Sequence, residues 1–224
     1  MKPMLLFDLD GTLWDSAANV AESWNIIFSR EYPSLPKLTK DDVHGVMGLT
    51  MKEIQDRLHP SIPDERRTPI FDECCRYEVE YLREHGGEPY PDLRRVMEEL
   101  KLRGYTLGIV SNCQCGYIDA FLNSVGVQDL FRDYEEWERT GLTKGENIRL
   151  VMRRNDFDNA IYIGDTQKDQ EAAVQAGVPF IHAAYGFGRV SAPDAVIRSL
   201  SDLPDVIETL TRKKAHSCSG FRRP

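Results

Sequence analysis

Short apolar runs of strand length recur along the chain and alternate with segments of helical periodicity. The helical segments repeat their apolar residues about every three to four positions, and several of them end at glycine. The predicted strands are residues 4–10, 105–110, 133–137, 160–163, 178–183 and 195–197. The predicted helices between and after them are residues 93–102, 117–125, 147–154, 168–175 and 203–210.

The chain between residues 16 and 84 has a different pattern, with helical periodicity and no strand-like run. Thr39 is followed by acidic residues, which predicts a helix start with Thr39 as its N-cap. Segments 51–58 and 71–82 are amphipathic and are separated by prolines. Two glycines then predict a hinge or linker over residues 85–89.

Strands that alternate with helices predict an α/β fold, in which right-handed crossovers place helices on both faces of a parallel sheet. Residues 1–15 and 86–211 are expected to form this core domain. Residues 16–85 are expected to form a small α-helical domain inserted after the first strand. We expect residues 212–224 to be a disordered basic tail.

Composition narrows the class of protein. Of the 224 residues, 41% are hydrophobic and 29% are charged, which is typical of a soluble globular protein. The net charge of −8 argues against nucleic acid as a partner, because a phosphate backbone requires a basic surface. The N-terminal segment resembles neither a signal peptide nor a membrane span, so we expect no membrane partner.

The cysteines are odd in number and form no paired metal-binding pattern. They are Cys74, Cys75, Cys113, Cys115 and Cys218. Free thiols in a reducing compartment are the simplest interpretation, which predicts a cytoplasmic protein.

The first strand carries two aspartates, Asp8 and Asp10, at its carboxyl end. Because strand side chains alternate, both carboxylates are expected to project in the same direction. Two buried like charges repel each other unless a cation lies between them. Carboxylate oxygens are hard ligands, so Mg²⁺ is the expected cation. An acid beside a metal can also act as a nucleophile towards phosphorus.

Further polar groups follow other predicted strands. Ser111 and Asn112 end one strand, and Gly164 and Asp165 end another. In a parallel sheet, ligands bind beyond the carboxyl ends of the strands. These groups and the two N-terminal aspartates are therefore expected to lie at one edge of the sheet.

Four segments resemble, in order, the motifs of the haloacid dehalogenase (HAD) superfamily in its phosphatase form. Residues 7–13 read FDLDGTL, residues 108–112 read GIVSN, residues 143–147 read TKGEN and residues 163–169 read IGDTQKD. Many relatives have proline where this chain has Gly145. The resemblance extends to about residue 210 and implies a Rossmann-like parallel sheet. It also implies that the helical insert is a C1-type cap, as in phosphoglycolate phosphatases.

The resemblance also implies roles for individual residues. Asp8 would attack phosphorus and form an aspartyl phosphate, and Asp10 would act as general acid and base. The implied catalytic residues are Asp8, Asp10, Ser111 and Lys144. The implied phosphate- or substrate-binding residues are Gly11, Thr12, Ser111, Asn112, Lys144 and Lys52. The implied ligands of Mg²⁺ are Asp8, Asp10 through its backbone carbonyl, Asp165 and Asp169.

Residues 47–52 resemble the specificity loop of such caps, which makes Lys52 and His44 candidates for substrate contact. Trp14 is a third candidate, as a wall of the pocket. Each has an ordinary alternative, because lysine and histidine are common on helix surfaces and tryptophan is common in cores.

The leading functional hypothesis is a Mg²⁺-dependent phosphatase of a small phosphorylated metabolite, phosphoglycolate or a sugar phosphate. A phosphomutase such as β-phosphoglucomutase would use the same core and cap. A phosphoaspartate receiver and a non-catalytic metabolite binder are weaker alternatives, since the insert is long and every expected catalytic position is filled. A monomer or a weak homodimer is expected.

Overall fold

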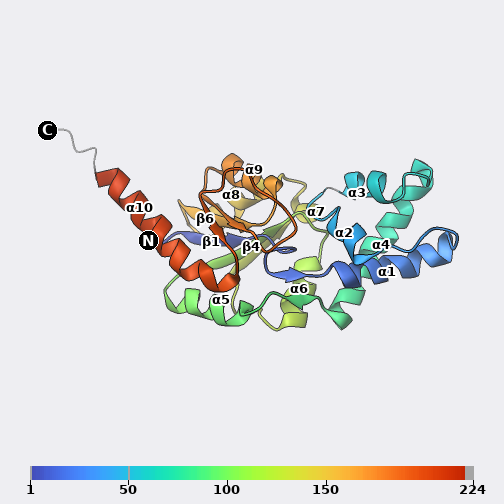
Figure 1. The fold of residues 1–224 in the computed structure, drawn as a ribbon, viewed down its shortest axis with the longest axis horizontal. Helices are drawn as coiled ribbons and strands as arrows, with labels where there is room; N and C mark the ends of the chain where they lie inside the picture. The colour runs from blue at the N-terminus through green and yellow to red at the C-terminus, as the bar shows by residue number, and fades with distance from the viewer. Residues whose placement is uncertain (1, 50, 220–224) are drawn as a thin grey trace.

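The computed structural model describes residues 2–49 and 51–219 (Figure 1). A six-stranded sheet lies at its centre, with the strand order β5-β4-β1-β6-β7-β8. Every neighbouring pair in this sheet is parallel. The strands are β1 (Met4–Phe7), β4 (Leu107–Ser111), β5 (Asp133–Glu136), β6 (Ala160–Gly164), β7 (Phe180–Ala183) and β8 (Ala195–Ile197). The predicted α/β parallel fold is confirmed.

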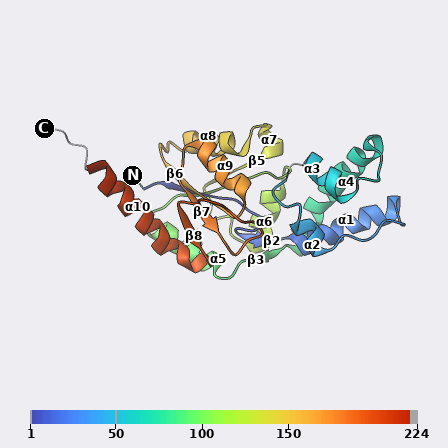
Figure 2. The same cartoon turned by 45° about the horizontal axis from the view of Figure 1, so that its top comes forward.

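Helices cover both faces of the sheet (Figure 2). Strand β1 shows why, because its side chains alternate: Leu5 and Phe7 join one apolar cluster, whereas Met4 and Leu6 join a second. The second cluster includes α8 (Lys144–Arg154) and α9 (Gln167–Ala176). The first includes α5 (Leu93–Leu102), α6 (Tyr117–Val125) and α10 (Leu203–Ser219). The short helices α7 (Trp137–Thr140) and η1 (Leu200–Asp202) complete this part of the chain.

Four helices lie beyond one end of the sheet, at the right of Figure 1. They are α1 (Ala17–Glu31), α2 (Lys40–His44), α3 (Met51–Leu58) and α4 (Asp64–His85). Thr39 caps α2 as predicted: its hydroxyl accepts a hydrogen bond from Asp42 N, and the Asp42 carboxylate accepts one from Thr39 N. Helices α1 and α4 pack together through edge-to-face rings, including Trp24 and Phe71 at 5.5 Å between centroids.

Helix α4 starts earlier than the predicted segment 71–82. It begins directly after Pro63, with Asp64 and Glu65 in its first turn, where acidic side chains interact favourably with the helix dipole. Arg67 and Ile70 continue the buried face of the helix towards this start. The helix then runs on to His85.

A two-stranded antiparallel ribbon replaces part of the predicted linker at residues 85–89. Its strands are β2 (Trp14–Asp15) and β3 (Glu88–Pro89). The ribbon connects the helical segment to the sheet on both the outgoing and the returning chain. Its packing requires glycine, because a Cβ at Gly87 would lie 2.7 Å from the Trp14 ring. A glycine-rich segment of this kind predicts a flexible link, whereas here it allows close contact with a buried indole.

Strand β1 ends at Phe7, short of the predicted end at residue 10. The chain turns because the Leu9 carbonyl accepts hydrogen bonds from Thr12 N at 3.2 Å and Leu13 N at 2.8 Å. Asp8 and Asp10 therefore do not both follow the alternation of a strand. Both aspartates nevertheless line the same cavity.

The expected disordered tail also needs correction. Helix α10 continues to Ser219, so residues 212–219 are helical, and residues 220–224 lie outside the described part of the chain. Arginine, lysine and alanine have high helix propensity, so a helix that is already nucleated against the core continues through them at little cost.

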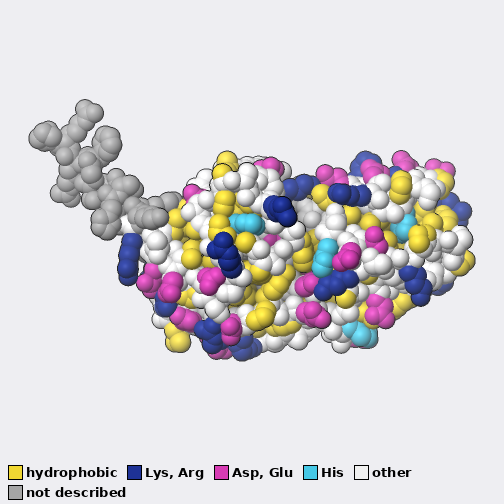
Figure 3. All heavy atoms as spheres, viewed as in Figure 1, with side chains coloured by type: hydrophobic (Ala, Val, Ile, Leu, Met, Phe, Trp, Pro, Cys, Tyr) yellow, Lys and Arg dark blue, Asp and Glu magenta, His cyan; other side chains and the backbone are white. Residues whose placement is uncertain are grey.

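Charged side chains of both signs are interspersed on the face in Figure 3, where no broad basic patch is seen. This agrees with the excess of acidic residues. Within residues 2–49 and 51–219, no helix has both the length and the apolar character needed to cross a membrane.

Candidate active site

The candidate site lies at the carboxyl edge of three neighbouring strands, β4, β1 and β6. Asp8 follows β1, Ser111 is the last residue of β4, and Asp165 follows β6. Lys144 and Asp169 are in the first turns of the helices that follow β5 and β6. Parallel strands bring these five residues together because all the carboxyl ends meet at one edge.

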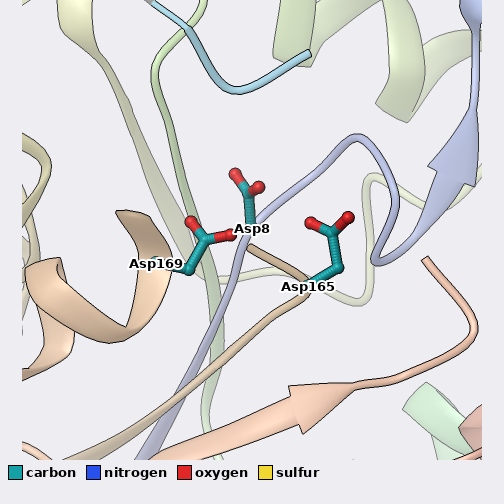
Figure 4. Close-up of side chains that lie close together, drawn as sticks. All are labelled: Asp8, Asp165 and Asp169. Carbon is teal, nitrogen blue, oxygen red and sulfur yellow. The ribbon is translucent and has the colours of Figure 1, made fainter. Parts of the chain in front are cut away.

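Asp8, Asp165 and Asp169 form a buried carboxylate cluster (Figure 4). One oxygen from each lies within 4.8 Å of the others. Figure 4 shows the Asp8 and Asp165 carboxylates side by side, with the Asp169 carboxylate extending from α9 towards Asp8. Three buried acids this close repel one another, so the cluster requires positive charge.

Lys144 supplies one positive charge. Its Nζ donates to Asp8 Oδ1 at 3.0 Å and to Asp169 Oδ1 at 2.6 Å, and the side chain is only 6% exposed. Burial by itself would lower the pKa of this ammonium, but the charges of Asp169 and Asp8 raise it well above its ordinary value. Thr143 caps the helix directly before Lys144, in a capping box with Glu146.

Gly145 lies against Gln175. A Cβ at this position would come within 2.5 Å of Gln175 Oε1. Gln175 Nε2 in turn donates to Thr143 Oγ1 at 3.0 Å. Gln175 therefore occupies the space that a side chain at position 145 would need. Lys144 keeps its contacts with Asp8 and Asp169.

Asp169 uses both of its oxygens within the protein. Oδ1 accepts from Lys144, while Oδ2 accepts from Thr166 N at 2.9 Å and from Thr166 Oγ1 at 2.6 Å. It is therefore at once an acid in the first turn of α9 and a partner of the buried lysine. Asp169 can therefore both cap α9 and take part in the candidate active site.

Asp165 has an oxygen with no protein partner. Its Oδ2 accepts from Phe187 N at 2.8 Å, whereas Oδ1 is buried and has no hydrogen bond to any described residue. Burial, together with Asp169 and Asp8, raises the pKa of this carboxyl to about 8. Burial and Asp169 also raise the pKa of Asp8 to about 6, against the effect of Lys144. An unpaired buried oxygen beside a second carboxylate fits a hard divalent cation.

Two glycines pack closely around Asp165. A Cβ at Gly11, where φ is +77°, would lie 2.3 Å from Asp165 Oδ2. A Cβ at Gly186 would lie 2.4 Å from Asp165 Cβ. Any side chain at either position would displace the carboxylate. Gly11 thus shapes the space for Asp165.

Asp10 lines the same cavity as Asp8 and has its own hydrogen-bond partners. Its Oδ1 accepts from Ser16 Oγ at 2.7 Å and from Tyr117 OH at 3.0 Å. Loss of water around the carboxyl raises the pKa of Asp10 to about 7, although the Ser16 hydrogen bond opposes this shift. A group with this pKa can both donate and accept a proton near neutral pH.

A cavity of about 1090 Å³ separates the sheet edge from the helical segment. Five of the predicted site residues line it from the core side: Asp8, Asp10, Ser111, Asn112 and Lys144. Helices α1 and α4 line it from the other side. The cavity is large enough for a phosphorylated small molecule.

Other predicted residues are not brought to this cavity. Lys52 has a side chain that is 79% exposed and pairs with Asp56 at 3.1 Å. Thr12 is fully buried and, like Gly11, does not line the cavity. The predicted loop at residues 47–52 lines it through Met47, Gly48, Leu49 and Met51, whereas Thr50 lies outside the described residues.

The remaining two candidates have structural surroundings instead. Trp14 is fully buried and packs edge-to-face on Tyr117 and Phe121. His44 bonds Asp15 at 3.0 Å and stacks on Phe187 at 4.3 Å between ring centroids. Their roles in substrate contact stay predictions.

Three residues near the candidate catalytic groups were missed by the sequence reasoning. Ser16 and Tyr117 bond Asp10, and Phe187 bonds Asp165 through its backbone. Ser16 directly precedes α1, where a serine is usually interpreted as a cap. Tyr117 and Phe187 carry no local signal, because their partners are distant in the sequence.

The Lys144→Met substitution is expected to lower the free energy of unfolding by about 3 kcal/mol, because it leaves buried acids without their cation. Lys168→Met is the matched control: Lys168 lies between Asp165 and Asp169 in the sequence but is 41% exposed, and its loss should cost less than about 1 kcal/mol. Chemical denaturation at pH 8 with a chelator present measures both. Equal losses would contradict the role given to Lys144.

The fold and the site define a class of α/β proteins that carry a buried acidic centre, ready for a cation, at the carboxyl edge of a parallel sheet. The family model of haloacid dehalogenase-like hydrolases matches residues 5–183. The chain therefore belongs to the haloacid dehalogenase-like hydrolase family and is an enzyme, as the resemblance in the sequence predicted.

Known proteins agree with this assignment over nearly the whole chain. A phosphoglycolate phosphatase of Caulobacter vibrioides is 28% identical over 92% of this chain and 91% of its own. One of Rhodobacter capsulatus is 27% identical, over 94% and 99%. A crystal structure of a predicted phosphoglycolate phosphatase from Haemophilus somnus superimposes with a TM-score of 0.79 at 21% identity, covering 92% of this chain and 97% of that one.

CbbY of Rhodobacter sphaeroides, crystallised with xylulose-(1,5)bisphosphate, superimposes with a TM-score of 0.76 at 17% identity. The superposition covers 91% of this chain and 96% of that chain. At such identities the solved structures establish the shared fold.

Proposed function

We propose that the protein is a Mg²⁺-dependent phosphatase that hydrolyses a small phosphate monoester through a phosphorylated Asp8. The observation that carries the proposal is the carboxylate cluster. Asp8 is held by a buried lysine, lies beside an Asp165 oxygen that lacks a protein partner, and lines a cavity large enough for a metabolite.

Asp8 and Asp165 would hold the cation, together with the backbone carbonyl of Asp10 that the family resemblance implies. When bound, Mg²⁺ would neutralise charge on the acid cluster and on the phosphoryl oxygens. Asp169, the remaining predicted ligand of the cluster, would also position the lysine, because Lys144 and Thr166 donate to its two oxygens.

In the first step, an oxygen of Asp8 forms a bond to phosphorus while the bond from phosphorus to the ester oxygen breaks. Asp10 gives its proton to that oxygen, which leaves as an alcohol. In the second step, Asp10 takes a proton from water, the water oxygen bonds to phosphorus, and the Asp8–phosphorus bond breaks. Inorganic phosphate is released and both aspartates return to their starting state.

The phosphoryl group would be held by core residues that line the cavity. Ser111 can donate through its hydroxyl and Asn112 through its backbone N–H. Lys144 provides a point charge that offsets the charge on phosphate. We further propose that residues 16–85 form the cap domain, which covers the leaving group and limits access of water.

The relatives support a phosphorylated metabolite as substrate. The relatives from Caulobacter vibrioides and Rhodobacter capsulatus are named phosphoglycolate phosphatase, and one structural neighbour was crystallised with a sugar bisphosphate. Release of inorganic phosphate from para-nitrophenyl phosphate, dependent on Mg²⁺ and abolished by chelation, tests the proposed reaction. No release above background would refute it. With a sugar bisphosphate, phosphate retained on the product would instead indicate a phosphomutase.

The Mg²⁺ requirement is expected to depend on pH, because protons and the cation compete for the same carboxylates. Without a cation, the pKa of Asp8 is about 6 and that of Asp165 about 8, so protons leave only as the pH rises. The Mg²⁺ concentration for half-maximal activity should therefore decrease as the pH is raised from 6 to 8. The expected decrease is roughly tenfold per pH unit if Mg²⁺ displaces one proton. Metal titrations at several pH values measure this, and a constant half-saturation would contradict it.

A further inference from the structure

A buried acid in the helical segment has no place in the proposed chemistry. Glu78 of α4 is only 4% exposed and lines the cavity opposite the catalytic edge. Four other acids line the cavity away from this edge, namely Asp72, Glu80, Glu138 and Glu171, and all four are exposed. Burial of a carboxyl is costly unless hydrogen bonds compensate it, so the position of Glu78 calls for an explanation.

The protein satisfies Glu78 only in part. Trp24 Nε1 donates to Glu78 Oε2 at 2.6 Å. A carboxylate can accept several hydrogen bonds, so capacity remains on the side that faces the cavity. Apolar side chains of Val20 and Val79 line the same cavity and offer no hydrogen bond.

Gln114 provides a complementary group from the core. Its side chain lies beside Glu78 and lines the same cavity. The Gln114 amide is close enough to Glu78 to lower the pKa of that carboxyl, but its buried Nε2 makes no hydrogen bond of normal geometry in the part of the chain that the structure describes. Native proteins rarely leave a buried donor unpaired, so a ligand atom is the expected partner.

A hydroxyl group fits this pair, because it accepts one hydrogen bond and donates another. It can accept from Gln114 Nε2 and donate to Glu78. A carboxylate has no proton to donate and would bring a second acid against Glu78. The apolar neighbours Val20 and Val79 suit the carbon chain that carries the hydroxyl.

We propose that Glu78 and Gln114 bind a hydroxyl of the leaving group and thereby select phosphate esters of polyols or sugars over phosphate esters of hydroxy acids. This inference rests on the proposed phosphatase function. It assigns the specificity to α4 and to the loop before α6, whereas the sequence placed it in residues 47–52.

The protonation state of Glu78 determines how strongly the site discriminates between a hydroxyl and a carboxylate. Burial raises the pKa of Glu78 to about 8, so the carboxyl loses its proton in moderately alkaline solution. A substrate hydroxyl can hydrogen-bond to Glu78 in its protonated or its ionised form. A substrate carboxylate can hydrogen-bond only to protonated Glu78. The titratable groups that face Glu78 are Asp10 and Tyr117 of the core and Cys74 and Cys75 of its own helix.

The experiment compares matched substrates that differ only in their terminal group. One pair is sn-glycerol 1-phosphate and 3-phospho-D-glycerate, and a longer pair is D-erythritol 4-phosphate and 4-phospho-D-erythronate. The measured quantity is the ratio of kcat/KM for the hydroxyl substrate to kcat/KM for the acid. The protonation of Asp8 and Asp10 that the chemical step requires is the same for both members of a pair, so this contribution cancels in the ratio.

In at least one pair, the wild-type ratio is expected to exceed ten at pH 9 and to be several-fold lower at pH 7. Glu78→Gln should lower the ratio at pH 9 at least tenfold, because an amide can donate to a carboxylate. Glu80→Gln is the matched control: it changes an exposed acid on the same helix that lines the same cavity, and its ratio should equal that of the wild type.

A Glu78→Gln ratio within threefold of the wild type in both pairs would overturn the inference. If that variant does not fold, the wild-type pH dependence decides, and a ratio that is constant from pH 7 to 9 overturns it. Para-nitrophenyl phosphate separates the two proposals. If the wild type hydrolyses para-nitrophenyl phosphate but the substrate ratio changes with neither pH nor Glu78→Gln, only the specificity site is refuted. If the wild type does not hydrolyse it, the phosphatase function is refuted as well.

Discussion

Asp8→Asn is expected to abolish turnover, with kcat reduced by at least about 10⁴-fold, because an amide oxygen is a poor nucleophile towards phosphorus. The substitution keeps the shape of the side chain and leaves an oxygen for the Lys144 ammonium, which donates to Asp8 Oδ1. The protein should therefore stay folded. Phosphate release from para-nitrophenyl phosphate measures the loss, and the thermal unfolding midpoint verifies the fold.

Asp158→Asn is a suitable control, since this exposed aspartate precedes β6 and lies away from the cavity. It should retain full activity. Covalent labelling of the wild type by the phosphoryl group of its substrate, absent in Asp8→Asn, would identify the nucleophile directly. Substantial turnover by a folded Asp8→Asn protein would remove Asp8 from this role.

Asp10→Asn is expected to have an effect that depends on the leaving group. An alkyl alcohol needs a proton as it departs, so its phosphate ester should lose about 10³-fold in kcat/KM. Para-nitrophenolate leaves without a proton, and its loss should be only about tenfold, from slower hydrolysis of the intermediate. Parallel assays of an alkyl and an aryl phosphate measure the difference. Equal losses would argue that Asp10 positions groups and transfers no proton.

The pH dependence of the wild type provides a second readout of Asp10. Its pKa of about 7 is raised mainly by burial, so the protonated acid declines as the pH rises above 7. Activity on the alkyl phosphate should decline with it at saturating Mg²⁺, whereas the first step with the aryl phosphate should not. The Ser16 and Tyr117 hydrogen bonds stabilise the ionised form and limit the rise of the pKa.

The sheet could be predicted from the sequence because its information is local. Most strands of the sheet are apolar runs, with β5 as the exception, and helices such as α5 and α6 end where a glycine with positive φ follows. The order of elements then requires a parallel sheet. The same logic predicts which strand ends carry polar groups, and it brings Ser111, Asp8 and Asp165 to one edge.

The predictions failed where a short segment is controlled by distant contacts. The chain turns after Phe7, so Asp8 and Asp10 acquire different hydrogen-bond partners that strand alternation does not predict. Gly87 was interpreted as part of a hinge, but it packs against the Trp14 ring in a two-stranded ribbon. Lys52 lies in the segment predicted to contact substrate, residues 47–52, but its side chain pairs with Asp56 and does not line the cavity.

The sequence by itself determined the parallel α/β fold, the family and the acids, hydroxyl and lysine from which the site is made, since these depend on periodicity and on short motifs. Only the tertiary structure decided how those groups are used. It placed Tyr117 on Asp10, left one Asp165 oxygen unpaired and set Glu78 beside Gln114 across the cavity. The physical reason is that pKa values and unpaired atoms depend on neighbours far away in the chain, and folding alone brings those neighbours together.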